Sequence, residues 1–154
     1  MQVSFGINQL TPEILSSILN SAYIKTCPLP MSAEAANGPI HAIGELDGWK
    51  FSVHAGPFDA INFTCVFKFE ANLSEEELIK ISNHTDRYPV DSTYEGIDAS
   101  SGIAIMSLNY RHVVPEDETI SAGYIVKLAR YFIKHLELQK NHWPSIVKAA
   151  LKEG

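Results

Sequence analysis

Apolar residues recur along the chain with the spacings of helices and strands, and the first pattern is helical. Thr11 and Pro12 are residue types that favour a helix cap and the first helical position. Four apolar residues behind them form one stripe with helical spacing: Ile14, Leu15, Ile18 and Leu19. The pattern predicts a helix that ends near residues 20–22. Residues 22–26 could add a short strand, and residues 27–39, which include three prolines, have the composition of a loop.

The clearest local signal is Asp47-Gly48, a two-residue turn typical of a β-hairpin, between residues 40–46 and 49–54. Counting outward from the turn gives the register: Leu46 with Trp49, Glu45 with Lys50, Gly44 with Phe51, Ala42 with Val53, and His41 with His54. The residues expected to share the core face are Trp49, Phe51 and Val53. The turn therefore predicts a register that can be checked pair by pair.

Two further elements follow this hairpin. Residues 61–69 alternate between apolar and polar side chains and predict a strand with one buried face. Ser74 and Glu77 have the spacing of a capping box, which predicts a helix that ends near Arg87-Tyr88-Pro89. Cys65 points inward on the predicted strand, where a thiol packs like a small hydrophobe.

The remaining pattern predicts a second hairpin, from residues 92–96 and 103–111, and a long helix at residues 120–140. The core stripe of that helix comprises Ile125, Leu128, Ala129, Phe132 and Leu136. Trp143-Pro144 breaks the helix, and residues 145–152 could form a short terminal one. Successive strands are joined by turns too short for parallel crossovers. The sequence thus predicts an α+β fold: a mostly antiparallel sheet of about five strands with helices packed on it, in one domain over residues 1–154.

Charge and composition exclude several classes of function. The 154 residues include 18 acidic and 12 basic side chains, a net charge of −6, and the basic residues are scattered. Nucleic acid is therefore not an expected partner, because no cationic stripe is present to displace counterions. No apolar run approaches the roughly 20 residues of a membrane span. The first residues, MQVSFGINQL, lack the features of a signal peptide, so we expect a cytoplasmic protein.

Candidate chemistry is sparse. His41 and His54, opposed across the hairpin, could share a metal ion, but the sequence fixes no third ligand near them, and an exposed pair that binds no metal is expected. The chain has no G-x-S-x-G elbow, Walker loop or G-x-G-x-x-G motif. We therefore expect a protein that is not an enzyme and needs no cofactor.

A partner surface is the better-supported expectation. Tyr124, Tyr131 and Leu138 recur every seven residues beside the core stripe of the long helix, and tyrosine is enriched at interfaces. Alternatively, this flank simply widens the buried face of the helix. Exposure of the three side chains would distinguish these interpretations.

Two segments carry a family resemblance: LDGWKFSVHAGPFDAINFTCVFKFEANLSEEEL and ISNHTDRYPVDSTYEGIDASSGIAIMSLNY. Over about residues 10–140 the chain resembles the YbjN family, the domain described as a bacterial sensory transduction regulator. Asn83 and Arg87 stand where that family tends to carry an Asn and a basic residue, although Arg87 could equally be the basic end of its helix.

The resemblance implies a fold similar to the class I chaperones of type III secretion, which dimerise and hold an extended segment of a client protein. We therefore expect a non-catalytic, protein-binding regulator or chaperone-like module that forms a homodimer. The possible partner-binding residues are Tyr124, Tyr131, Leu138, Asn83 and Arg87. The alternatives are a small-molecule or metal-binding protein with a pocket between sheet and helix, and an immunity or inhibitor protein.

Overall fold

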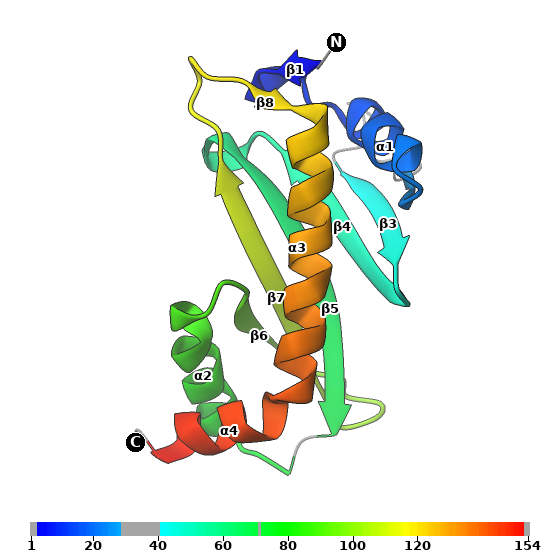
Figure 1. The fold of residues 1–154 in the computed structure, drawn as a ribbon. Helices are drawn as coiled ribbons and strands as arrows, with labels where there is room; N and C mark the ends of the chain where they lie inside the picture. The colour runs from blue at the N-terminus through cyan, green and yellow to red at the C-terminus, as the bar shows by residue number, and fades with distance from the viewer. Residues whose placement is uncertain (1–2, 29–40, 71, 153–154) are drawn as a thin grey trace. The chain divides into compact units, whose positions relative to one another are not determined.

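The computed structural model describes residues 3–28, 41–70 and 72–152. The fold is α+β, as predicted, with helices packed on an antiparallel sheet (Figure 1). The sheet has six strands rather than about five, in the order β2-β3-β4-β5-β7-β6, and β1 and β8 form a separate two-stranded sheet. The strands are β1 (Ser4–Phe5), β2 (Lys25–Pro28), β3 (Ala42–Leu46), β4 (Trp49–Ala55), β5 (Ala60–Glu70), β6 (Asp91–Ile97), β7 (Ile103–Val113) and β8 (Ile120–Ser121). The main helices are α1 (Pro12–Ser21), α2 (Glu75–His84), α3 (Ala122–Asn141) and α4 (Trp143–Lys152). None of the described helices is long and apolar enough to cross a membrane.

Four boundaries differ from the sequence prediction. Helix α2 ends at His84 rather than near Arg87-Tyr88-Pro89, and a 3-10 turn, Thr85–Arg87, follows it. Cys27 and Pro28 belong to strand β2, because they pair with β3, so the predicted loop starts too early; its residues 29–39 lie outside the described part of the chain. Ile120 begins the short strand β8, which pairs with β1, and α3 starts two residues later. Helix α4 starts at Trp143 rather than at residue 145, since a proline is tolerated in the first turn of a helix.

The chain divides into two compact units, which are described separately. The first unit comprises residues 1–63 and 111–133, and the second comprises residues 64–110 and 134–154. Strands β5 and β7 and helix α3 contribute residues to both.

In the first unit, the register of the β3–β4 hairpin is confirmed for four of the predicted pairs: Leu46 with Trp49, Glu45 with Lys50, Gly44 with Phe51, and Ala42 with Val53. Asp47 and Gly48 adopt φ angles of 52° and 83°, the left-handed conformation that this tight turn requires. Gly44 leaves room for the ring across the hairpin, because a Cβ there would lie 2.6 Å from Phe51 Cζ. Local turn chemistry therefore sets the register, and the glycine accommodates the aromatic core.

Three phenylalanines form the centre of this unit. The ring of Phe132, on α3, lies 5.6 Å from that of Phe63 and 6.3 Å from that of Phe51, measured between centroids. All three side chains are buried. Such aromatic contacts add about 0.5–1.5 kcal/mol per pair beyond the burial of apolar area. This cluster attaches α3 to the strands β4 and β5.

The outer edge of strand β2 is covered by one side chain from α1. The Asn20 side-chain amide donates to the Thr26 carbonyl oxygen at 2.7 Å and accepts from the Thr26 backbone N–H at 2.9 Å. An unpaired edge strand is a template for aggregation, and here Asn20 takes the hydrogen bonds that another strand would make.

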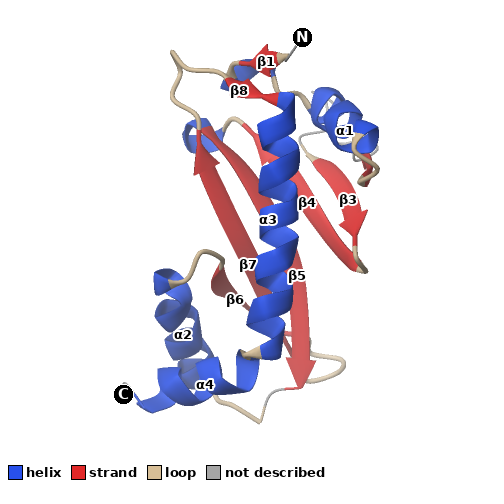
Figure 2. Cartoon of the chain, in the orientation of Figure 1, coloured by secondary structure: helices blue, strands red, loops and turns tan. Residues whose placement is uncertain are grey.

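In the second unit, the predicted capping box is present at the start of α2. The Ser74 side chain accepts from the Glu77 backbone N–H at 3.2 Å, and the Glu77 side chain accepts from the Ser74 backbone N–H at 3.0 Å. Helix α2 packs against α4 and along β6 (Figure 2). The buried residues between these elements are Leu78, Ile81, Ala104, Met106 and Ala150.

The outer edge of strand β6 is covered in the same way as that of β2. Ser82 Oγ donates to the Ser92 carbonyl oxygen at 2.7 Å and accepts from the Tyr94 backbone N–H at 3.1 Å. Thr85 Oγ1 accepts from the Ser92 backbone N–H at 2.8 Å. Hydroxyls from the end of α2 therefore occupy the edge that a further strand would pair with.

Replacing Thr85 by Val tests this edge protection. Valine keeps the shape of the side chain but leaves the buried Ser92 N–H without its acceptor, which should lower the free energy of unfolding by about 1–3 kcal/mol. The control is Thr93→Val on β6, the strand of Ser92. The exposed Thr93 hydroxyl accepts one long hydrogen bond, from the Asn109 side-chain amide at 3.4 Å, so this change should alter stability by less than about 0.5 kcal/mol. Urea denaturation measures both, and equal losses would show that the hydroxyl of Thr85 has no such role.

Candidate functional site

The second unit contains an open, mostly apolar pocket of about 430 Å³ between α3, α4 and the chain after α2. We call it the α3–α4 pocket. Its lining residues are Tyr88, Pro89, His135, Leu138, Gln139, His142, Ser145, Ile146 and Ala149. The volume lies within the range of about 300–1,000 Å³ typical of ligand sites.

The break between α3 and α4 creates this pocket. A proline at position 144 cannot continue α3, so the chain turns at His142 and starts a new helix. The backbone N–H of His142 donates to the Leu138 carbonyl at 3.1 Å, and that of Ile146 donates to the His142 carbonyl at 3.0 Å. Trp143 then packs edge-on against Phe67 of β5, with ring centroids 5.3 Å apart. The last turn of α3 and the first turns of α4 thereby form two walls.

Gln139 gives the pocket a polar group without a partner. Its side chain is 8% exposed and lines the pocket, and its Nε2 atom is buried with no hydrogen bond to the protein. Among the described residues the one other such side-chain atom is Ser16 Oγ, on α1, which does not line this pocket. Leaving a buried donor unsatisfied costs about 1–3 kcal/mol. A ligand with a hydrogen-bond acceptor would remove that cost.

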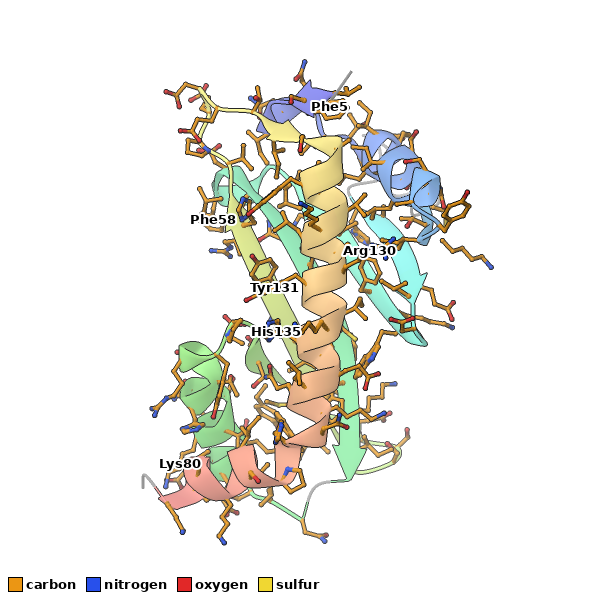
Figure 3. The ribbon with its side chains drawn as sticks, viewed as in Figure 1. Phe5, Phe58, Lys80, Arg130, Tyr131 and His135 are labelled. Atoms are coloured by element: carbon orange, nitrogen blue, oxygen red, sulfur yellow. The ribbon has the colours of Figure 1, made fainter. Side chains whose placement is uncertain are left out.

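The walls of the pocket carry no permanently charged side chain. The lining residues include no Asp, Glu, Lys or Arg. Burial, together with the charge of Lys134, lowers the pKa of His135 below its ordinary value of 6.5. His135 and Tyr131 project from the same side of α3, whereas Arg130 projects from the other side (Figure 3). The pocket therefore combines apolar walls, the imidazoles of His135 and His142, and one unpaired amide donor.

No family model, curated protein or solved structure matches this chain.

Of the predicted partner-binding residues, Leu138 alone lines the pocket, where its side chain is exposed. Tyr124 and Tyr131 are also exposed, so this flank does not widen the core. Tyr124 lies beside the imidazole of His112, with ring centroids 5.4 Å apart. Asn83 and Arg87 are exposed near the end of α2, just before the pocket residues Tyr88 and Pro89, but they do not line it.

Sequence reasoning missed Gln139, although its position carried a signal. It lies three residues after Leu136 and seven after Phe132, so it continues the apolar stripe of α3 at a position that should be buried. A polar residue at such a position needs a hydrogen-bond partner, either from the protein or from a bound ligand. His135 and Tyr88 had no comparable signal, because they reach the pocket only through the packing of separate elements.

The two histidines of the hairpin do interact, but through repulsion. Burial, then the nearby charges of His41 and Arg111, lower the pKa of His54. No group of three or more metal-ligating side chains occurs among the described residues. The cysteines are both free, and burial raises the pKa of the Cys65 thiol to about 11, which keeps it protonated and unreactive at neutral pH.

Replacing Gln139 by Met tests whether its amide is truly unpaired. Methionine has the same length and a similar helix propensity but no amide, so the free energy of unfolding should rise by about 1 kcal/mol. The comparison is Gln139→Glu, which buries a charge and should destabilise the protein at neutral pH. If chemical denaturation shows that Gln139→Met loses more than about 1 kcal/mol, the wild-type amide has a hydrogen-bond partner.

The lowered pKa of His54 predicts a dependence of stability on pH. The unfolded chain takes up the proton first as the pH falls through 6.5, so stability is full above that pH and declines until the pH passes the folded-state pKa. His41→Gln removes one of the two repelling charges and should raise the His54 pKa and reduce this decline. NMR titration of the His54 ring protons measures its pKa, and urea denaturation measures the decline of stability with pH. Both experiments are done in sodium chloride solution. An unchanged His54 pKa in the variant would contradict the prediction.

Proposed function

We propose that this protein is a non-catalytic protein-binding module, in which the α3–α4 pocket receives a segment of a partner protein. An apolar side chain of the partner enters the pocket, and the Gln139 Nε2 group donates a hydrogen bond to a main-chain carbonyl oxygen of the same segment. The observation that carries the proposal is the buried, unpaired amide donor in an open apolar pocket.

The absence of lysine and arginine from the pocket lining favours a peptide over an anion. A carboxylate placed beside Gln139 would lose its hydration, and neither of those side chains lines the pocket to offset that loss. A peptide carbonyl is a neutral acceptor that stands one bond away from a Cα carrying an apolar side chain. One residue of a partner protein therefore supplies both features that the pocket requires.

The energetics indicate that the pocket anchors a partner and that further contacts complete the binding. Burying one leucine-sized side chain contributes about 1.5–3 kcal/mol, and one hydrogen bond adds about 0.5–1.5 kcal/mol. The upper end of that sum is close to about 4.1 kcal/mol, the size of the binding free energy that corresponds to a millimolar dissociation constant. The exposed side chain of Leu138 at the pocket offers further apolar surface for the same partner.

The covered edges of the sheet favour this helix-lined site over strand addition. Asn20 occupies the hydrogen-bonding groups of Thr26 in β2, and Ser82 and Thr85 occupy those of Ser92 in β6. A partner strand would first have to displace these side chains. The proposal agrees with the client-holding role that the resemblance to the YbjN family implies, and the homodimer that it implies stays a prediction.

Blocked dipeptides test the recognition chemistry directly. N-acetyl-Leu-Leu-methylamide should shift the Gln139 side-chain amide resonances and the Ile146 methyl resonances in NMR spectra, whereas N-acetyl-Ser-Ser-methylamide should not. Isobutylbenzene, which is apolar but has no acceptor, should bind more weakly than the leucine peptide by about the value of one hydrogen bond, a factor of roughly three to ten. Equal affinities for these two compounds would favour a small-molecule site over peptide recognition.

A peptide-display selection tests binding to a protein segment. Peptides selected on the wild-type protein should carry apolar anchors and should lose affinity for Leu138→Asp and Gln139→Met. The control is Lys127→Ser, at an exposed position of α3 that does not line the pocket, which should retain the peptides. Selected peptides that bind all four proteins equally would place the interaction elsewhere and reject the proposal.

A further inference from the structure

In the first unit, Arg111 is held in a fixed orientation on the sheet. Its Nε atom donates to Asn62 Oδ1 at 3.1 Å, and its guanidinium lies 4.9 Å from the centroid of the Phe58 ring. Arg111 is at the end of β7 and Asn62 is on the neighbouring strand β5. These contacts use Nε and one face of the guanidinium, and they leave the terminal N–H groups for another acceptor.

The residue that supports Arg111 is held in an unfavourable conformation. Phe58 has a φ angle of 57°, in the left-handed region that bulky residues rarely adopt, and its side chain is 78% exposed. Figure 3 shows it near the end of β7. An exposed ring gains little from burial, so the fold itself does not explain why a strained position carries phenylalanine. Support for the guanidinium does explain it.

One histidine lies near this guanidinium. His54, on β4, is close enough to Arg111 and to His41 for their charges to disfavour its protonation. Among the described residues, no carboxylate pairs with Arg111. The whole chain carries a net charge of −6 with its histidines counted as neutral, so the positive charge of Arg111 is not a general property of its surface.

We infer that Arg111 is the centre of an oxyanion site, with His54 near it, that binds the phosphate group of a phosphate monoester. A planar guanidinium fixed along one edge presents parallel N–H donors that match two oxygens of a phosphate. His54 lies on β4, which is separated from β7 by β5, and a neutral imidazole carries one N–H group that can donate to the same anion. A phosphate dianion is attracted to the guanidinium more strongly than a carboxylate is, which favours phosphate over acetate. Asn62 acts as a positioning residue through its bond to Nε.

NMR titration with inorganic phosphate, phenyl phosphate and acetate tests this site. The Arg111 Nε–H resonance, assigned by its loss in Arg111→Gln, should shift with both phosphates and should saturate at lower concentration than with acetate. Tighter binding of phenyl phosphate than of inorganic phosphate would identify a monoester on an aromatic carrier, and equal binding would identify the phosphate group alone. Acetate binding as tight as phosphate binding would overturn the inference, as would no shift with any of the three.

Variants separate recognition from folding. Arg111→Gln should weaken phosphate binding about tenfold or more, because it removes a charge-assisted interaction. Arg111→Lys should recover part of that loss, because it keeps the charge but not the planar donor pair. Phe58→Asn should also weaken binding without unfolding the chain, because asparagine tolerates the left-handed conformation. Retention of leucine-dipeptide binding at the α3–α4 pocket serves as the check of folding, and undiminished phosphate binding by Arg111→Gln would overturn the inference.

Discussion

The packing of Phe132 against Phe51 and Phe63 fixes the rotation of α3, and much of the structure depends on that rotation. A helix turns once in about 3.6 residues, so once Phe132 faces the core, the positions before and after it are determined. Leu136 is then buried, and Gln139, one turn further, continues on the same side. The apolar residues that precede Gln139 on α3 therefore place this polar residue at a buried position. The unpaired amide of Gln139 is a consequence of where α3 must pack, and its cost is tolerated at the opening of a pocket.

Both edges of the sheet are closed by side chains that imitate a neighbouring strand. One amide from α1 takes up the donor and the acceptor of Thr26, and two hydroxyls near the end of α2 do the same for Ser92. Short polar side chains suit this purpose because they reach backbone groups within one hydrogen-bond length and lose little rotamer freedom. The arrangement blocks association through the edges, and it leaves faces and pockets as the surfaces through which a partner can be recognised.

The features that the sequence predicted correctly are those determined by neighbouring residues. The β3–β4 register follows from the turn at Asp47-Gly48, and the capping box of α2 follows from residues three positions apart. Strand β8 has only two residues and pairs with β1, more than a hundred positions away, so it leaves no periodic pattern. The pocket could not be predicted for a related reason: Tyr88 and Gln139 come to line the same pocket only through packing between separate elements. The proximity of Arg111 to His54 also depends on the order of the strands in the sheet. The pairing of His41 with His54, in contrast, was expected from the turn.

Local rules of protein structure are obeyed through most of the described chain, and three of the positions that break them lie at the two proposed sites. Others lie elsewhere: the Ser16 hydroxyl is buried without a partner, and Tyr23 has a φ angle of 64°. Gln139 buries a donor without an acceptor, Phe58 holds a bulky side chain at positive φ, and Arg111 adds charge beside histidines that already repel. Each of these lowers stability, and each could be removed by one substitution. Proteins retain such costs where a ligand offsets them. The chemistry of each violation also indicates its ligand, because a donor without a partner in apolar walls favours a neutral acceptor, whereas a guanidinium without a carboxylate partner favours an anion.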